Sequence, residues 1–428
     1  MVRCRTRGDL AAWAGLRVVP ATGRGRRALG VAAFVVVVAG CASASHAGPR
    51  PFSIATVRVV NHTYVVPDPA KAGRPGELAA ASDRGPGRLT ANAERWTLLY
   101  HSSNSVGRDV VVSGALLVPR GTPPAGGWPV VSWGHGTTGL ADRCAPSQRE
   151  NLFYNEYAQE ARSFLNAGYA VVATDYPGLG TPGVHTYLIG VDEGNAMVDI
   201  VTAARRAVPH LSTQWFAVGH SQGGQAVLFA SRAAHRDRRL RLRGTVAIAP
   251  ASHLDIILPA VLSGNDPSDL SYALYSLIGL SAVDPSVDLS ALVARAGLAR
   301  LPLITEGECL DQTDAAFKAV TPRDVFRISA HETTRLSAKL GSAANPDNTP
   351  VIGPVLVVQG ADDGDVPAPI TTAMVQHLHR LGSDISERLY PGLNHDGVLG
   401  PSSCDVLAWL ARHGGPRVRA CRSQPSAP

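Results

Sequence analysis

Short apolar runs, each long enough for one strand, recur along this chain and are separated by stretches long enough for a helix. The apolar runs lie at residues 110–119, 129–134, 170–175, 215–219, 245–249, 355–359 and 385–390. Stretches suited to helices lie between them at residues 155–167, 194–207 and 222–234. Strands that are apolar on both faces occur in parallel sheets, because helices cover both sides of such a sheet. The pattern predicts an α/β fold with a mostly parallel central sheet flanked by helices.

One long segment, residues 252–350, interrupts this alternation. It has no clear strand, and Leu270, Leu274, Leu277 and Ile278 follow helical spacing. A structureless loop of that length would be unusual in a compact domain, so we expect a helical insertion that acts as a cap. The predicted domain core then has two parts, residues 91–251 and 351–428.

The first 40 residues have the layout of an export signal. An Arg-rich start precedes the apolar run 28–39, which is too short to cross a hydrocarbon core about 30 Å thick and suits a signal-peptide h-region. The run ends in VAGC at Cys41, the pattern of the bacterial lipoprotein box. We predict a signal peptide over residues 1–40, a lipid anchor on Cys41 and a tether with an N-terminal extension over 41–90. The protein would be exported and held on the outer side of the cell membrane, or in the cell wall or secreted. An ordinary secretory signal followed by a chance Cys is the alternative.

The net charge of +6 does not indicate a nucleic-acid partner. Residues 1–40 contain seven Arg and one Asp, and the rest of the chain has 33 basic and 33 acidic residues. The excess charge therefore belongs to the leader and not to a binding surface. We expect no binding to nucleic acid.

The cysteines point to disulfides and not to a metal. Once the leader Cys4 and the anchor Cys41 are set aside, four remain: Cys144, Cys309, Cys404 and Cys421. An even number in an exported chain indicates two disulfides, with three possible pairings. No C-x-x-C spacing occurs, so a zinc site is not expected. We predict no metal and no organic cofactor.

The strongest local motif is GHSQG at residues 219–223, a G-x-S-x-G. It follows the apolar run 215–218 and precedes the helical stretch 222–234, which is the strand–turn–helix setting of a nucleophile elbow. Glycines at both ends allow a sharp turn, and the helix N-terminus favours developing negative charge. We predict Ser221 as the nucleophile; the alternative is an ordinary turn with a capping Ser.

A serine nucleophile needs a base and an acid, which in this fold follow it in the order acid, then His. After the run 355–359 comes GADDGDVP, in which Asp363 is favoured over Asp362 and Asp365 because it begins a D-x-x-V-P pattern. His395 follows the last strand on a Gly-rich loop. We predict a triad of Ser221, Asp363 and His395.

Attack on an acyl carbon also needs donors for the oxyanion. The backbone N–H of Gln222, directly after the nucleophile, supplies one. The second should come from the loop after strand 129–134, and we favour the N–H of Thr137, with Gly136 as the alternative.

Several segments together resemble the secretory lipase family of α/β-hydrolases over roughly residues 90–425. They are WGHGT at 133–137, ADRCAPS at 141–147, DYPGLGT at 175–181, the GHSQG elbow, and the acid and His loops. The resemblance implies triacylglycerol lipase or esterase activity and a helical cap inserted before the acid-bearing strand. It also implies the pairings Cys144–Cys309 and Cys404–Cys421. The lipoprotein box and the Pro/Gly-rich linker before residue 88 depart from the family.

We therefore expect an exported, lipid-anchored serine hydrolase that cleaves carboxylic esters of the acylglycerol type through an acyl-enzyme. Its partners would be a small-molecule lipid or ester and the membrane that holds the anchor. An acyltransferase, a serine peptidase and a non-catalytic binding lipoprotein are the alternatives. Apolar runs at 254–262 and 274–280 of the insertion either form its own core or line an acyl cavity, with Ile278 as a lining residue.

Overall fold

The computed structural model describes residues 55–68, 72–86, 89, 92–264, 267 and 269–417. The predicted signal peptide, the anchor Cys41 and Cys421 lie outside these residues. In the part of the chain that the structure describes, no helix is both long enough and apolar enough to cross a membrane.

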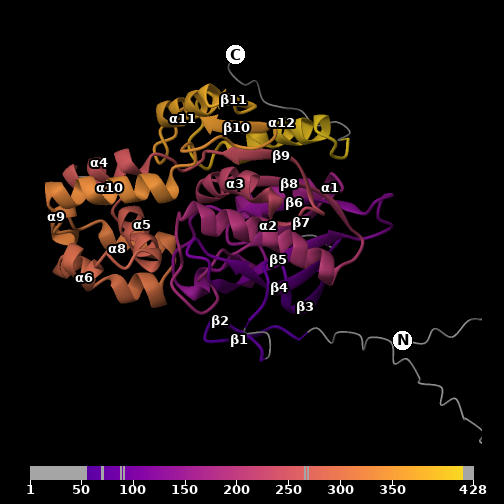
Figure 1. Ribbon diagram of the computed structural model, residues 1–428, viewed down its shortest axis with the longest axis horizontal. Coiled ribbons are helices and arrows are strands. Elements are labelled where there is room, and N and C mark those ends of the chain that lie inside the picture. The colour runs from indigo at the N-terminus through magenta and orange to yellow at the C-terminus, as the bar shows by residue number, and fades with distance from the viewer. Residues whose placement is uncertain are drawn as a thin grey trace, which may run out of the picture. The chain divides into compact units, whose positions relative to one another are not determined.

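The central sheet has nine strands in the order β11-β10-β9-β8-β6-β7-β5-β4-β3 (Figure 1). The strands are β3 (Leu78–Pro86), β4 (Ala93–Ser103), β5 (Asp109–Pro119), β6 (Trp128–Gly134), β7 (Ala170–Thr174), β8 (Leu211–His220), β9 (Arg241–Ile248), β10 (Val355–Gly360) and β11 (Ile385–Tyr390). Strands β6 to β11 pair in parallel, and β7, β5, β4 and β3 pair antiparallel. The predicted mostly parallel sheet is confirmed. Strands β1 (Arg58–Val60) and β2 (Thr63–Val65) form a separate hairpin.

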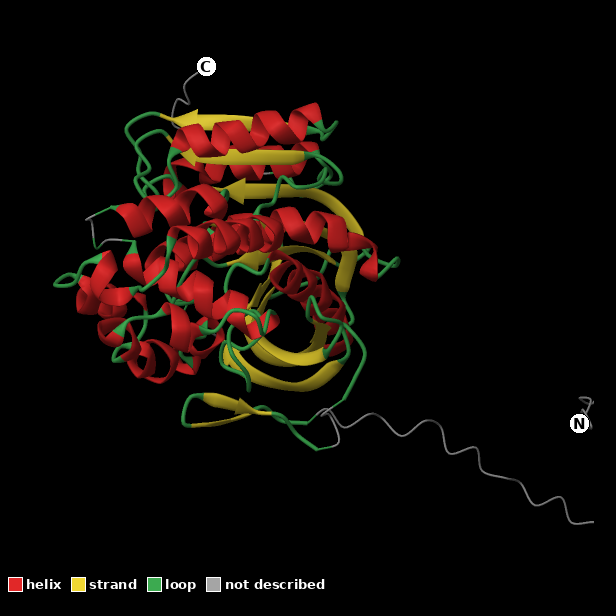
Figure 2. Cartoon of the chain, turned by 60° about the vertical axis from the view of Figure 1, so that its left-hand side comes forward, coloured by secondary structure: helices red, strands yellow, loops and turns green. Residues whose placement is uncertain are grey.

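Helices cover both faces of the sheet (Figure 2). One face packs against α2 (Gly190–Ala207), α3 (Gln222–Ala233) and α11 (Ala368–Arg380). The other packs against α1 (Asn155–Asn166) and α12 (Leu399–Arg412). Strands β7 and β10 are buried along their whole length, as their unbroken apolar sequences predict.

Strands β3 and β4 did not stand out in the sequence. Strand β3 forms the antiparallel edge and β4 lies beside it. Strand β4 begins with the charged residues Glu94 and Arg95, and β3 contains Ser82, Asp83 and Arg84. Such mixed sequences give a weaker signal than an apolar run. Part of the predicted N-terminal extension, residues 41–90, is therefore an edge strand of the main sheet.

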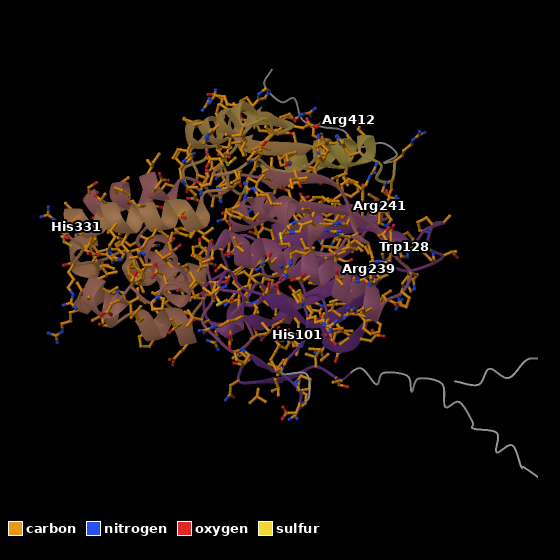
Figure 3. All side chains as sticks on the ribbon, in the orientation of Figure 1. His101, Trp128, Arg239, Arg241, His331 and Arg412 are labelled. Carbon is orange, nitrogen blue, oxygen red and sulfur yellow. A yellow bond between two sulfur atoms is a disulfide. The ribbon has the colours of Figure 1, made fainter. Side chains whose placement is uncertain are left out.

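The segment between β9 and β10 is helical. It contains α4 (Leu254–Ser263), α5 (Leu270–Val283), α6 (Leu289–Leu292), α7 (Arg295–Leu298), the π-helix η4 (Leu303–Gly307), α8 (Leu310–Phe317), α9 (Pro322–Val325) and α10 (Ala330–Ala344). These helices share a hydrophobic core, in which Leu140, Tyr187, Leu188 and Ile189 from the rest of the domain also take part. In Figure 2 the arrowheads of β9, β10 and β11 point toward the side that carries the insertion. Figure 3 shows His331, at the start of α10, at the outer edge of the insertion. Arg241, at the start of β9, lies at the opposite end of the strand, away from the insertion.

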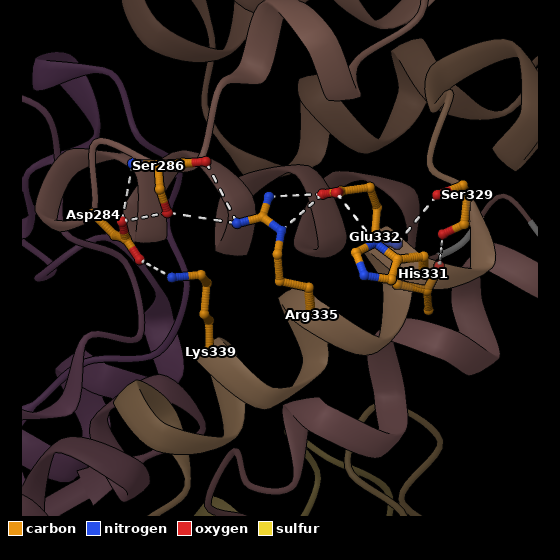
Figure 4. Close-up of polar contacts among 8 residues, drawn as sticks. Asp284, Ser286, Ser329, His331, Glu332, Arg335 and Lys339 are labelled. Carbon is orange, nitrogen blue, oxygen red and sulfur yellow. Dashed lines mark hydrogen bonds and ion pairs between the residues drawn. The ribbon is translucent and has the colours of Figure 1, made fainter.

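Polar contacts fix α10 to the end of α5 (Figure 4). Lys339 pairs with Asp284, and Arg335 contacts both Glu332 and Ser286. These ion pairs are partly exposed, so each contributes at most about 1 kcal/mol. The apolar core of the insertion therefore supplies most of its stability.

A disulfide joins Cys144 to Cys309, with their Cα atoms 5.5 Å apart. Cys144 ends the 3₁₀ turn η1 (Asp142–Cys144), which is followed by η2 (Pro146–Gln148), and Cys309 precedes α8. The pairing that the resemblance implied is present, and it ties the loop after β6 to the insertion. Cys404 is also disulfide-bonded, while its expected partner Cys421 lies outside the described residues.

We expect the double variant Cys144→Ala/Cys309→Ala to be less stable than the wild type. The bridge joins residues 165 positions apart, and loss of such a crosslink costs about 2–5 kcal/mol in free energy of unfolding. Denaturant unfolding of both proteins under oxidising conditions measures the difference. An unchanged midpoint would show that the crosslink does not stabilise the fold.

Candidate active site

Ser221 stands in a sharp turn between β8 and α3, with φ 56° and ψ −118°. A residue with a side chain rarely adopts this conformation, and surrounding structure must hold it in place. Here the end of β9 and the residues after it do so: the Ser221 N–H donates to the carbonyl of Ile248 at 2.9 Å, and the N–H of Ala251 donates to the Ser221 carbonyl at 3.1 Å. The Ser221 side chain is thereby presented at the carboxyl edge of the sheet.

The glycines of the motif are required by backbone contacts. A Cβ on Gly223 would lie 2.0 Å from the carbonyl oxygen of Gly134 in β6, and one on Gly219 would lie 2.3 Å from the carbonyl oxygen of Gly223. No side chain can occupy these spaces. The G-x-S-x-G pattern thus follows from the packing of α3 onto β6 and β8.

Asp363 and His395 form a buried pair on the loops that follow β10 and β11. His395 Nδ1 lies 2.8 Å from Asp363 Oδ2. The other carboxylate oxygen accepts from the N–H groups of Asp365 and Val366 at 2.9 and 2.8 Å, and Gln359 donates to Oδ2 at 2.8 Å. Of the three candidate acids, Asp363 is the one that contacts His395, whereas Asp362 and Asp365 are exposed.

Their pKa values move in opposite directions. Burial by itself raises the pKa of Asp363, but the hydrogen bond and charge of His395 and the N–H donors outweigh it and leave the pKa below its usual range. Burial by itself lowers the pKa of His395, but the hydrogen bond and charge of Asp363, helped by Asp365 and Asp396, raise it above its usual value. The pair is therefore a carboxylate that stabilises a protonated imidazole.

Ser221 and His395 line the same cavity. Among the hydrogen bonds of the described residues, none joins Ser221 Oγ to the imidazole. Catalytic hydrogen bonds of unliganded enzymes are often long and shorten when substrate binds. The three predicted triad residues are brought to one edge of the sheet.

Two backbone N–H groups are available near Ser221 for an oxyanion. Gln222 is the first residue of α3, so its N–H has no acceptor within the helix. Thr137 lines the cavities that contain Ser221, and its hydroxyl lies 2.6 Å from Tyr187 Oη. The alternative, Gly136, already donates its N–H to Tyr157 Oη at 3.0 Å. This contact favours Thr137 as the second donor.

Buried polar residues hold in place the loop after β6, which carries Gly136 and Thr137 and is called the oxyanion loop. Asp175, after β7, accepts from the N–H of Ser147 at 2.8 Å and from the hydroxyls of Ser147 and Ser113. Tyr176 donates its hydroxyl to the carbonyl of His135 at 3.1 Å. The ADRCAPS and DYPGLGT segments are thus linked by hydrogen bonds to each other and to the oxyanion loop.

The side chain of Gln222 has its own buried partners. Its amide donates to Glu193 Oε1 at 2.6 Å and lies 3.2 Å from His185 Nε2. Burial raises the pKa of Glu193 to about 8 and lowers that of His185 to about 4. Sequence reasoning did not find these residues, because a single Glu or His inside an apolar pattern carries no local signal of its role.

One group in the described part of the chain has the spacing of metal ligands: His220, His395 and Asp396. Its donors do not suit a metal. His220 Nε2 faces the carbonyl of His395 at 3.1 Å and its Nδ1 faces Tyr157 Oη at 3.2 Å, so neither nitrogen offers a lone pair to an ion. We therefore assign no metal to this group.

A parallel sheet with a nucleophile elbow after β8, and with acid and His loops after β10 and β11, defines the α/β-hydrolase fold. The predicted fold is confirmed. Residues 151–281 match a family described as serine aminopeptidase, S33. This stretch contains Ser221 and ends before Asp363 and His395. No curated protein matches the chain.

Solved structures of this fold resemble the chain at low sequence identity. The rice cell wall degrading esterase LipA from Xanthomonas oryzae is 18% identical with a TM-score of 0.65, over 80% of this chain and 99% of that one. Candida antarctica lipase A in its closed state is 18% identical with a TM-score of 0.67, over 82% and 86%. A putative hydrolase from Legionella pneumophila is 18% identical with a TM-score of 0.68, over 79% and 99%.

The pKa directions predict how activity depends on pH. His395 must be neutral to accept a proton, so activity falls as the pH drops through its raised pKa. The charge of Asp365 helps to raise that pKa. We expect Asp365→Asn to move the acid limb of kcat/KM to lower pH and Asp362→Asn, the matched control on the same loop, to leave it in place. Equal profiles for all three proteins would refute the coupling.

Proposed function

We propose that this protein is a serine hydrolase that cleaves carboxylic esters with an apolar acyl chain. The proposal is supported above all by one juxtaposition. Ser221, on a strained elbow, lines a cavity together with His395, which is hydrogen-bonded to Asp363. This arrangement supports acyl transfer through a covalent intermediate.

The reaction follows from these positions. The His395 imidazole takes the proton of Ser221 Oγ while Oγ bonds to the carbonyl carbon of the ester, and the carbonyl oxygen becomes an oxyanion that accepts from the N–H groups of Gln222 and Thr137. The C–O bond to the alcohol breaks, and His395 gives the proton to the departing oxygen. Water then attacks the acyl-enzyme in the same way and releases the acid and free Ser221.

An apolar cavity supports the choice of an acyl group. It runs from Ser221 between α4 and α5, and Leu254, Leu258, Val261 and Ala273 are among its lining residues. The insertion thus contributes both to a hydrophobic core and to a cavity wall. The expectation that Ile278 lines the cavity is wrong: its side chain is buried in the core of the insertion, because it lies on another face of α5.

A second cavity meets the first at Ser221 and is polar. Its acidic lining residues are Glu156, Asp311, Asp314, Asp365 and Asp396, and no Lys or Arg of the described chain joins them. We assign the alcohol part of the substrate to this side. Uncompensated carboxylates there would disfavour an anionic leaving group.

Cleavage of an N-terminal residue from a peptide is the second candidate. The S33 match over 151–281 favours it, and so does the acidic cavity, whose carboxylates could pair with an α-amino group. Aminoacyl p-nitroanilides and neutral p-nitrophenyl esters, assayed side by side, separate the two candidates. Product analysis with glycerol or a sugar present separates hydrolysis from acyl transfer to that acceptor.

We further propose that the protein is exported and anchored by a lipid on Cys41. The support is the sequence pattern of residues 1–41, which lie outside the described residues.

We expect Ser221→Ala to abolish hydrolysis of short p-nitrophenyl esters, with a loss of at least about 1000-fold, and to abolish labelling by a fluorophosphonate probe. Circular dichroism of the variant should match the wild type, because only one oxygen is removed. Activity near the wild-type level would overturn the assignment of the nucleophile and exclude the triad. An unlabelled wild type would favour a non-catalytic binding protein.

Substitution in the apolar cavity should change the preferred acyl length. Ala273→Leu adds volume to the cavity wall and should shift the optimum of kcat/KM to shorter acyl chains. Each methylene that no longer fits should cost about 1–3 kcal/mol in transition-state binding. Ala282→Leu, on the exposed end of the same helix, is the control. If both variants keep the wild-type profile, the acyl chain binds elsewhere.

Cys41→Ser should release the protein from membrane fractions or leave it unprocessed. The reason is that a lipid on this residue would be its anchor. Fractionation with immunoblotting, and labelling with a fatty-acid analogue, measure both effects. A variant that remains membrane-bound and is processed normally would contradict the anchor.

A further inference from the structure

The residue that precedes the nucleophile, His220, links the elbow to two other loops of the site. It is the last residue of β8, and its side chain is 1% exposed. Its Nε2 lies 3.1 Å from the backbone carbonyl oxygen of His395, and its Nδ1 lies 3.2 Å from Tyr157 Oη. Tyr157 in turn contacts the N–H of Gly136 at 3.0 Å.

These contacts form a chain of hydrogen bonds from the His395 carbonyl to the Gly136 N–H, and the two end groups fix the direction of every hydrogen bond in it. A carbonyl oxygen only accepts, so His220 Nε2 carries the proton and donates to His395. Nδ1 is then unprotonated and accepts from the Tyr157 hydroxyl. The Tyr157 oxygen remains free to accept from Gly136, whose N–H only donates.

Burial keeps these protonation states constant. It lowers the pKa of His220 to about 3, and it raises the pKa of Tyr157 well above its usual value. Both groups are therefore neutral at every pH at which a serine hydrolase with a His base is active. His220 cannot act as a second base, because both of its ring nitrogens are engaged.

We propose that His220 is a positioning residue that fixes the His395 loop and the oxyanion loop in their positions relative to Ser221; this inference rests on the proposed function. The oxyanion loop lies directly against the chain of hydrogen bonds. A Cβ on Gly136 would lie 2.4 Å from Tyr157 Oη, 3.1 Å from Ser221 Cβ and 3.3 Å from His220 Nδ1. The imidazole rings of His220 and His395 are also in contact, with centroids 4.7 Å apart.

Loss of this link should affect His395 in a way that a general loss of packing does not. If the His395 backbone is freed, its hydrogen bond to Asp363 weakens. That bond and the charge of Asp363 raise the pKa of His395. The pKa should therefore fall, and the acid limb of kcat/KM should move to lower pH.

The experiment compares His220→Phe, which removes both nitrogens, with His220→Gln, whose amide can still donate to the His395 carbonyl. His101→Phe is the matched control: His101 is also 1% exposed, pairs with Asp109 and lies on β4 away from the insertion (Figure 3). Active sites are counted by titration with a fluorophosphonate, so that kcat refers only to folded enzyme.

We expect His220→Phe to lower kcat by up to about 100-fold with little change in KM, because a displaced base costs rate and not binding. Its acid limb should shift to lower pH. His220→Gln should recover most of the rate and the wild-type limb, and His101→Phe should show neither change. A lower kcat with an unshifted limb and no recovery in His220→Gln would show that His220 only packs, and would overturn the proposal. Wild-type kcat and pH profile in His220→Phe would also overturn it.

A second test does not depend on His220→Phe being stable. Tyr157→Phe removes the hydroxyl between Gly136 and His220. Its loss of kcat and that of His220→Leu, which also removes both ring nitrogens, should be non-additive in the double variant, because both act through one chain of hydrogen bonds. Additive losses would overturn the proposal. Failure of the proposed function is recognised separately, since the wild type would then be neither labelled nor active.

Discussion

The contact of three backbone segments at the elbow sets the position of every other group in the site. Strand β6, strand β8 and helix α3 approach so closely at Gly134, Gly219 and Gly223 that no Cβ fits between them. Ser221 has a positive φ at this point, and the end of β9 and the residues after it hold it there through two backbone hydrogen bonds. The strain of this conformation is local, and the packing of the parallel sheet offsets it.

Around the elbow, the loops at the carboxyl edge are held by buried polar groups and not by apolar contact alone. Asp175, Glu193 and His220 are each no more than 1% exposed, and each has a hydrogen-bond partner at least 28 positions away in the sequence. Burying such groups is costly unless they are paired, so their partners are closely specified. The loops are thereby fixed in one arrangement relative to Ser221, which is what a preorganised oxyanion site needs.

The insertion gives this site its two different sides. Helices α4 and α5 add an apolar wall on one side of Ser221, whereas carboxylates from the insertion and from the loops surround the other. The Cys144–Cys309 bridge connects the insertion to the loop that carries Thr137. This division supports the proposed substrate, which has an apolar acyl chain and a neutral or cationic leaving group.

Much of the fold was already determined by the sequence. Apolar runs long enough for one strand, alternating with helical stretches, specify a parallel sheet, and the glycines around Ser221 specify the turn, because these signals are local in the chain. The order of the acid and His loops then predicted His395 as the base and one of Asp362, Asp363 and Asp365 as the acid, with Asp363 favoured. Strands β3 and β4 were missed, because charged and polar residues are mixed with apolar ones in their sequences. Only the tertiary structure could decide between Asp363 and its neighbours, place Ile278 in the core and not in the cavity, and join His220 to His395 across 175 positions. Such contacts depend on where loops from different strands meet, and no local pattern records that distance.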